Sequence, residues 1–541
     1  MFVFYDTETT GLDMDFTQIL QIGMLFTDDD LNILSTKKID CRNSVWDVPA
    51  PAALLTTGFT PANLKASKNS NFDMMQEVNR WLRSQHWPLT FVGYNNIDYD
   101  EPVLAQNFYQ NLLFPYLTSS KSQIEGQPNG RADVLYMVQM AALYTPGVLK
   151  LDALNNSGTP SLTLKNVAAQ NGVGLSDADA HDALNDIKAT LGVAKLIKKA
   201  APHIWDQGLA LSTVEGVDKF LNDHEIFTFA RFMYGRTDKS SVMTSLAERK
   251  GSKTQALFDL RVDPAPYLAM SVDELKDVFL LKKGSPFVLA RKESQPILMP
   301  MEYSDAVLRE SDDVALFKRR AKALKADPAF LEKVARAMLL AKQAQLAAGP
   351  QFSSKMPEVL INKRVAAPAR GKLDAWSKEF RDAANWHDRA VLAGDFNARF
   401  KDELTADPLL ERFGKLATRL VFEHAPQELT AAKQEAMNKF IANRILNPDL
   451  KAPYMTIARA RKELAKIEAD RADPKGKKWN EVTTADITNL KGYYTRMETA
   501  YAKYYQPQQQ PPANNNDMSA LQVPPVLVVK KPNVGNIQPK P

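Results

Sequence analysis

The sequence contains a single cysteine, Cys41, in 541 residues, which excludes an intrachain disulfide and any zinc cluster built from cysteines. No run approaches the ~18 apolar residues that a membrane helix needs, and the N-terminus, MFVFYDTET, has no basic segment before an apolar core. We therefore expect a cytoplasmic protein without membrane association. A bound metal would have to use oxygen ligands or the six histidines.

The net charge of the chain, +5, is small but unevenly distributed. Residues 1–200 contain 15 Lys and Arg against 21 Asp and Glu, a net charge of −6, whereas residues 201–541 contain 53 against 42, a net charge of +11. A basic region beside an acidic one is typical of a protein that holds a polyanion next to clustered carboxylates. Solvated surface charge explains the asymmetry equally well, so it does not identify a function alone.

The apolar pattern of the first 200 residues predicts a mixed α/β fold. Strands are expected at residues 2–5, 19–26 and 31–39 as an antiparallel meander, followed by a buried strand at 89–94. Helical periodicity predicts the remaining elements, at 72–83, 102–113, 133–144, 162–170 and 182–199. The change in charge balance near Pro202 indicates a domain boundary at about residue 200.

The rest of the chain divides by composition. Short extended runs between residues 250 and 302 predict a β-rich module, and residues 305–505 are mainly helical in pattern, for instance at 313–347, 373–393, 402–422 and 457–469. The tail beyond residue 506 is rich in Pro, Gln and Asn and is expected to be disordered. The expected domains are residues 1–200, 201–350 and 351–506, with a tail at 507–541.

Asp6 and Glu8 stand at the end of the first predicted strand, where side chains at i and i+2 point to the same face. The sequence Thr9-Thr10-Gly11-Leu12 comes directly after them as a turn in which glycine permits close approach of a bound group. An isolated pair of this kind is more often an ordinary exposed strand end.

Asp100 ends the stretch NNIDYD, which comes directly after the strand FVGY. Ligands bind at the carboxyl ends of strands in α/β sheets, so an acidic residue there is suitably placed. Asp100 is preferred, but extended alternation would put Asp98 on the same face and leaves both open. An Asn/Asp turn with a helix cap before Pro102 explains Asp98 as well.

His181 and Asp186 occur together in DADAHDALNDIKAT. Five residues along a helix separate two side chains by about 140°, so both cannot share one helical face. His181 is expected on the loop before the helix, with Asp182 as the cap and Asp186 in the first turns.

These four carboxylates, Asp6, Glu8, Asp100 and Asp186, form an ordered set along the chain that outweighs each pair alone. Four converging carboxylates can hold two Mg²⁺ ions, and Mn²⁺ can substitute, because hard divalent cations prefer oxygen ligands. Two such ions stabilise the attacking and leaving oxygens of a phosphoryl displacement. A neutral histidine nearby, here His181, can accept the proton of the attacking water.

The three motifs DTETTGL (6–12), NNIDYD (95–100) and HDALND (181–186) resemble those of the histidine-bearing subclass of DEDD 3′-to-5′ exonucleases. This resemblance implies that Asp6, Glu8, Asp100 and Asp186 are metal ligands and that His181 is the general base. It also implies an RNase H-like domain with a five-stranded mixed sheet.

A narrower resemblance is to the exonuclease I family of bacterial single-strand DNA exonucleases. VGYNNIDYDEPVL, RADVL and PSLTLKNVAAQNGV are similar to that family, and the sequence after residue 250 resembles its SH3-like and helical modules. The resemblance implies a monomer that binds single-stranded DNA and the acidic tail of single-strand DNA-binding protein. It implies substrate contacts by Glu8, Thr9, Leu12 and Asn96. Thr10 departs from the family pattern, which has an aromatic residue after the Glu-Thr of this motif.

The leading hypothesis is a Mg²⁺-dependent 3′-to-5′ exodeoxyribonuclease that degrades single-stranded DNA to 5′-mononucleotides in DNA repair or recombination. One alternative is an RNA or proofreading exonuclease of the same superfamily, and another is a non-catalytic nucleic-acid-binding protein. Aromatic residues could stack on bases of the strand, which is tolerant of sequence. The candidates are Phe108, Tyr109, Phe114 and Tyr116.

Overall fold

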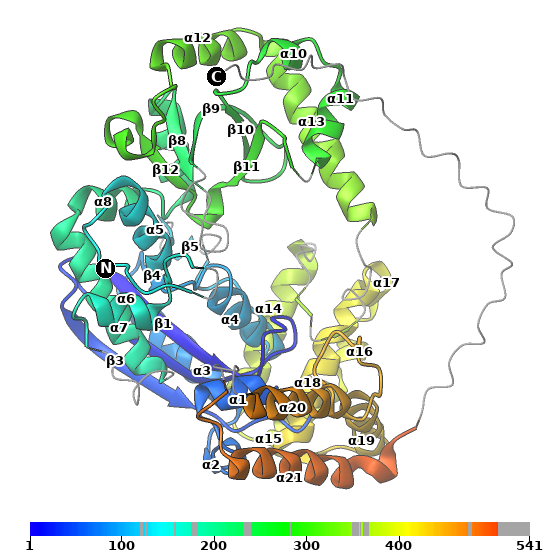
Figure 1. Cartoon of the computed structure of the whole chain (residues 1–541). Helices are drawn as coiled ribbons and strands as arrows, with labels where there is room; N and C mark the ends of the chain where they lie inside the picture. Colours follow the sequence, from blue (N-terminus) through cyan, green and yellow to red (C-terminus); the bar gives the residue numbers. More distant parts are fainter. Residues whose placement is uncertain are drawn as a thin grey trace, which may run out of the picture. The chain divides into compact units, whose positions relative to one another are not determined.

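The mixed α/β sheet predicted from the first 200 residues is present in the computed structural model (Figure 1). Its strands are β1 (Phe2–Thr9), β2 (Ile19–Thr27), β3 (Ile33–Asp40), β4 (Thr90–Gly93) and β7 (Gly130–Asp133). They lie in the order β3-β2-β1-β4-β7, with β2 antiparallel to β1 and β3, and with β4 parallel to β1 and β7. This arrangement confirms the predicted RNase H-like class and the antiparallel meander.

The structure describes most of the chain. The described residues are 1–119, 123–124, 127–155, 158–174, 182–230, 240–281, 283–348, 356–357, 359–360, 367–473 and 479–506. Residues Met1–Tyr505 form one compact unit. Within these ranges no helix is long and apolar enough to cross a membrane.

Both faces of the first sheet are covered, because alternate residues of β1 point to opposite sides. Phe2 and Phe4 pack with the helices α5 (Val134–Tyr144), α7 (Ala183–Ala200) and α8 (Pro202–Ala210). Val3 and Tyr5 pack on the other face, with α3 (Asn71–Arg83) and α4 (Asp100–Gln110). Strands β1, β2, β4 and β7 therefore form a buried layer between two layers of helices, and the edge strand β3 is largely exposed.

Four of the five helices predicted in this region begin at a residue whose side chain caps them, and α4 has no such cap. The Ser70 side chain accepts from the backbone of Asp73 in a capping box at the start of α3, and Asp182 caps α7. Strand β7 escaped prediction because its four residues, GRAD, are buried without an alternating apolar pattern. The shorter elements of this region are α1 (Pro51–Thr57), α2 (Asn63–Ala66), β5 (Gln123–Ile124), β6 (Gln127–Pro128) and α6 (Leu164–Gln170).

A second sheet, entirely antiparallel, has the strand order β11-β10-β9-β8-β12. Its strands are β8 (Phe227–Ala230), β9 (Ser240–Glu248), β10 (Thr254–Asp259), β11 (Phe287–Arg291) and β12 (Ile297–Pro300). The sheet thus begins at Phe227, whereas the sequence pattern placed its start at about residue 250. Helices accompany it, namely α9 (Val214–Asp223), α10 (Ala265–Leu268), α11 (Val272–Leu280), α12 (Val314–Lys325) and α13 (Pro328–Ala348).

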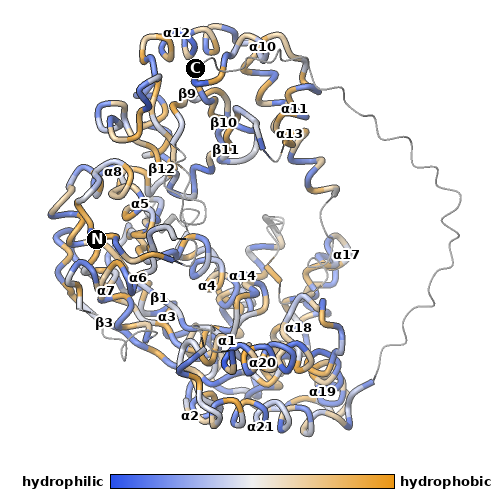
Figure 2. The backbone as a smooth tube through the Cα atoms, viewed as in Figure 1, coloured by the Kyte–Doolittle hydropathy of each residue, from blue (hydrophilic) through white to orange (hydrophobic). Residues whose placement is uncertain are grey.

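Helices make up the described part of the chain after residue 366, and blue and orange segments alternate along them in Figure 2. They are α14 (Ala367–Asp382), α15 (Trp386–Gly394), α16 (Phe396–Arg399), α17 (Lys401–Ala406), α18 (Glu411–His424), α19 (Ala431–Ile445), α20 (Ile457–Ala472) and α21 (Thr484–Tyr501). The single helices predicted at 313–347, 373–393 and 402–422 are wrong, because each is two helices. Pro328 starts α13, since proline cannot donate within a helix, and Asn385 caps α15.

Candidate metal centre

Three of the predicted carboxylates lie together at the end of β1. Asp6 and Glu8 of β1 and Asp186 in the first turn of α7 each contribute one oxygen, and these oxygens all lie within 4.8 Å of one another. The i, i+2 spacing on a strand therefore brings two carboxylates to one face, as predicted from the sequence. The packing of α7 on the sheet adds the third.

Gly23 of β2 allows α7 to approach this closely. It is the register partner of Asp6, and a Cβ atom at this position would lie only 2.8 Å from the carbonyl oxygen of Ala183. The Gln21 side chain accepts a hydrogen bond from the Ala183 backbone at 2.8 Å and so holds the start of the helix. Sequence reasoning overlooked both residues, because a glycine and a glutamine within a strand carry no sign of a distant helix.

Asp100, the first residue of α4, lies next to this cluster, and its charge is the largest electrostatic influence on Asp6. Its Oδ1 accepts hydrogen bonds from the backbone and the hydroxyl of Thr7, at 3.1 and 2.5 Å. Asp98 is instead half exposed, and its carboxylate accepts from the hydroxyl of Tyr136 at 2.8 Å. The structure therefore brings Asp100, not Asp98, to the cluster.

The close approach of these carboxylates shifts their ionisation. Burial, and then repulsion by Asp100 and Glu8, raises the pKa of Asp6 well above its ordinary value. Burial and repulsion by Asp186 raise the pKa of Glu8 to about 9, and burial raises that of Asp100 to about 7. Buried carboxylates this close together are difficult to ionise at the same time, because their negative charges repel. A hard divalent cation bound between them would neutralise that charge.

His181 lies outside the described residues, so its role as a general base stays a prediction. The described neighbour Asp182 caps α7 and forms an ion pair with Lys38 of β3.

The predicted substrate contacts differ in exposure. Leu12 is 84% exposed, whereas Asn96 is 1% exposed and donates to the Tyr5 hydroxyl at 3.4 Å. Thr9 is buried and lies 2.6 Å from the hydroxyl of Tyr99. Glu8 belongs to the carboxylate cluster itself. Contacts of these four side chains with a substrate stay predictions. Of the aromatic residues considered for stacking, Phe108 and Tyr109 are core residues, which leaves them no free ring face.

Asp133 is a further buried residue that holds this region in place. Its carboxylate caps α5 and accepts from the backbone of Asn95 at 2.8 Å, in the turn that leads to Asp100, where Asn95 has a φ of 63°. Its own backbone N–H donates to Gln295 Oε1 at 2.6 Å, so a residue before β12 reaches the first sheet. Burial raises the pKa of Asp133 to about 7. An acid directly before an apolar helix was a readable signal for Asp133, but Gln295 offered none.

Known proteins match both the sequence and the fold of the chain. The Exonuclease family, RNase_T, matches residues 3–194. Exodeoxyribonuclease I of Buchnera aphidicola subsp. Schizaphis graminum is 31% identical over 206 residues, which is 38% of this chain and 41% of that protein. Its counterpart in Escherichia coli K12 is 28% identical over 207 residues, again 38% and 41%. The chain thus spans less than half of the length of these two relatives.

Solved structures match over a much longer part of the chain. Exonuclease I from Methylocaldum szegediense has a TM-score of 0.72 at 22% identity, and the match covers 92% of this chain and 99% of that one. Escherichia coli exonuclease I in complex with a dA16 oligonucleotide has a TM-score of 0.69 at 20% identity, with the same coverage. At these identities the likeness concerns the fold.

The sheet, the carboxylates on β1 and the family match together define residues 3–194 as an exonuclease domain. The particular protein that the chain resembles is exonuclease I, in sequence over the first 200 residues and in fold over nearly the whole chain. These matches confirm the resemblance that the three motifs predicted.

Proposed function

We propose that this protein is a 3′-to-5′ exodeoxyribonuclease that degrades single-stranded DNA to 5′-mononucleotides. The observation that carries the proposal is the convergence of Asp6, Glu8 and Asp186 within 4.8 Å, with Asp100 beside them, in an exonuclease domain. The curated relatives are named exodeoxyribonuclease I, and solved exonuclease I structures hold dA16 and dT13 oligonucleotides. Both support DNA rather than RNA as the substrate.

The donor set fits Mg²⁺, with Mn²⁺ as a substitute. All four groups are carboxylates, which are the oxygen ligands that a hard divalent cation prefers. Burial raises the pKa of Asp6, Glu8 and Asp100, and repulsion by neighbouring carboxylates adds to the shift of Asp6 and Glu8. Asp6, Glu8, Asp100 and Asp186 would hold two such ions, which when bound supply charge stabilisation to the scissile phosphate and acidify a water.

The protein's own residues would position the substrate and move the proton. Thr7 orients the Asp100 carboxylate through two hydrogen bonds, which leaves the second oxygen of Asp100 for a ligand. His181 would take the proton of the attacking water as the general base. Thr9, Leu12 and Asn96 would contact the terminal nucleotides together with Glu8.

The basic remainder of the chain would hold the strand while the acidic exonuclease domain cleaves it. Residues 201–541 carry a net charge of +11, and basic groups that neutralise phosphates bind nucleic acid without regard to sequence. We assign residues 201–350 to an SH3-like module and 351–506 to a helical one. One solved structure is of SSB/exonuclease I with the inhibitor CFAM. The acidic tail of single-strand DNA-binding protein is the second partner that we propose for this chain. The enzyme would act as a cytoplasmic monomer in DNA repair.

The test is digestion of end-labelled single-stranded DNA and RNA of equal sequence, with Mg²⁺ or with EDTA. The proposal expects 5′-mononucleotides released from the 3′ end of DNA, and no release in EDTA. Asp186→Ala should lower the rate by ~10³-fold or more while circular dichroism and thermal unfolding stay those of the unmodified chain. Equal digestion of RNA would favour the RNA alternative, and undiminished hydrolysis by Asp186→Ala would refute the site.

A further inference from the structure

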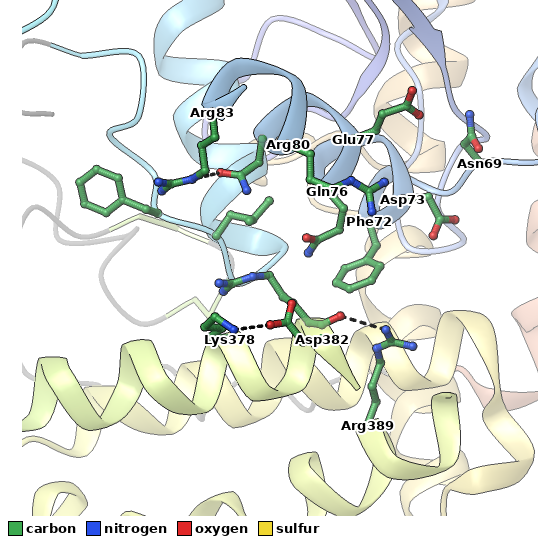
Figure 3. A pocket seen from close by; sticks show the side chains of 14 residues that line it. Asn69, Phe72, Asp73, Gln76, Glu77, Arg80, Arg83, Lys378, Asp382 and Arg389 are labelled. Atoms are coloured by element: carbon green, nitrogen blue, oxygen red, sulfur yellow. Dashed lines mark hydrogen bonds and ion pairs between the residues drawn. The ribbon is translucent and has the colours of Figure 1, made fainter. Parts of the chain in front are cut away.

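A cavity of about 730 Å³ lies between α3 and α14, apart from the carboxylate cluster (Figure 3). Arg80 and Arg83 line it from α3, and Lys378 and Arg381 line it from α14. Phe114 also lines the cavity. Five cationic side chains therefore share one cavity, four of them from two helices that are nearly 300 residues apart in the sequence and the fifth, Arg389, from α15.

Three carboxylates also line the cavity, but each has another partner. Asp73 accepts from the N-terminal backbone of its own helix in the capping box. Glu77 forms an ion pair with Lys37 of β3. Asp382 forms an ion pair with Lys378 at 2.6 Å. Each carboxylate of the lining is thus engaged in another contact, and Lys378, the lysine of the lining, is paired with Asp382. The positive charge in excess therefore belongs to the arginines.

Arg80 and Arg83 are exposed, and within the described part of the chain no carboxylate lies at ion-pair distance from either. The Arg83 Nε donates to Asn79 Oδ1 at 3.1 Å, which is a neutral acceptor. Arg381 donates to the carbonyl oxygen of Leu112, also neutral. Burial lowers the pKa of Arg381, and the nearby charge of Arg83 lowers it further, against the opposite effect of Asp382.

Phe114 adds a feature that an anion alone would not require. It is 44% exposed, and its ring meets the edge of Tyr116 at 5.9 Å between centroids. A nucleic-acid strand offers phosphates to guanidinium groups and a flat base to an open aromatic ring at every nucleotide, whereas an acidic peptide offers a ring only where its sequence supplies one. The cavity therefore fits a strand better than it fits a peptide.

We propose that this cavity is a second contact site for single-stranded DNA, in which Arg80 and Arg83 bind phosphates and Phe114 stacks on a base. The proposal rests on the proposed function, since it adds a holding site for the substrate of that reaction. The cavity would increase the affinity for the strand, whereas the carboxylate cluster would cleave it.

The main test compares full-length Arg80→Ala/Arg83→Ala with the unmodified chain, in EDTA, using a fluorescent oligo(dT) of ~30 nucleotides at several salt concentrations. We expect affinity about tenfold weaker near 0.1 M salt, and a slope of log affinity against log salt that is smaller by ~1.4, since each phosphate contact on a single strand contributes ~0.7. The matched control is Arg461→Ala/Arg471→Ala, which removes two arginines from α20. Unchanged affinity and slope in the cavity variant, or an equal loss in the control, would overturn the proposal.

Two further measurements identify the occupant. Phe114→Leu keeps an apolar side chain but removes the ring, and should weaken binding about fivefold or more if a base stacks there. If the arginine variant binds an acidic peptide more weakly but binds oligo(dT) as tightly as the unmodified chain, the cavity is a peptide site instead. Hydrolysis of a ~6-nucleotide substrate with Mg²⁺ should stay unchanged in both cavity variants. Failure of the unmodified chain to hydrolyse any strand would refute the proposed function, while the binding measurement in EDTA would still judge the cavity.

Discussion

Asp98 and Asp100 are two residues apart, yet their surroundings differ completely. Asp100 is buried and bonded to Thr7 beside the cluster, and Asp98 is half exposed and bonded to Tyr136. We expect Asp100→Asn to lower DNA hydrolysis by ~10³-fold or more, because it removes a charged ligand from the proposed metal centre. Asp98→Asn, the matched control, should stay within about twofold of the unmodified rate. Steady-state hydrolysis of single-stranded DNA checks both, and the reverse ranking would assign the ligand to Asp98.

The raised carboxyl pKa values also predict how stability depends on pH. A carboxyl whose pKa is higher in the folded state contributes stability below its unfolded pKa and loses that contribution as the pH rises through the folded value. For Glu8 this window runs from about 4.5 to about 9, and for Asp100 it extends from 3.8 to about 7. We therefore expect the metal-free protein to lose thermal stability between pH 5 and pH 9.

Thermal unfolding in EDTA and in excess Mg²⁺ measures this effect. Mg²⁺ should raise the melting temperature more at pH 9 than at pH 6, because a cation binds the deprotonated cluster. Glu8→Gln should flatten the pH dependence in EDTA, since it removes a carboxyl whose pKa is about 9 in the folded state. A melting temperature in EDTA that rises over this range would contradict the assigned shifts.

At the scale of elements, the second sheet supports the turn that carries Asp100. Gln295, just before β12, accepts from the Asp133 backbone at 2.6 Å and donates to the Gly208 carbonyl at 2.9 Å. Arg131 of β7 adds a buried ion pair with Glu101, the residue after Asp100, at 2.5 Å. The residue before β12 thus supports the turn on one side of the predicted ligand, and a strand of the first sheet holds the residue on its other side.

We expect Gln295→Ala to raise the Mg²⁺ concentration that gives half-maximal hydrolysis and to lower the turnover. It should also cost about 1–3 kcal/mol of stability, because it leaves a buried N–H without an acceptor. Gln255→Ala is a matched control, since Gln255 is buried in the same sheet and donates only to Ser245 at 2.9 Å within the described contacts. Mg²⁺ titrations of activity compare the two, and equal shifts would show that the effect is general destabilisation.

At the scale of the whole molecule, the exonuclease domain shares its core with the chain beyond residue 200. Trp205 packs against Phe2 with ring centroids 5.8 Å apart, and Ile297 and Met299 of β12 belong to the same core. Leu20 likewise shares a core with Ile441 of the helical region. The boundary predicted near residue 200 therefore passes through packed apolar residues.

A fragment of residues 1–200 should accordingly lack cooperative unfolding, because it exposes apolar surface that the full chain buries. A chain that ends at residue 506 is the comparison, and its melting temperature and rate of DNA hydrolysis should equal those of the full chain. Calorimetry and digestion of single-stranded DNA test both. A cooperative transition in the 1–200 fragment would show that the domain is independent after all.

The amino-acid sequence by itself determined the strands of the meander, most helices of the first 200 residues, the shared face of Asp6 and Glu8 and the family resemblance. These depend on periodicity and motif order, which neighbouring residues alone decide. Only the tertiary structure showed that Asp186 reaches β1 past Gly23, that Thr7 holds Asp100 beside the cluster, and that Gln295 contacts Asp133. Each of these depends on packing between segments from 93 to more than 160 residues apart, and such contacts leave no local pattern to read.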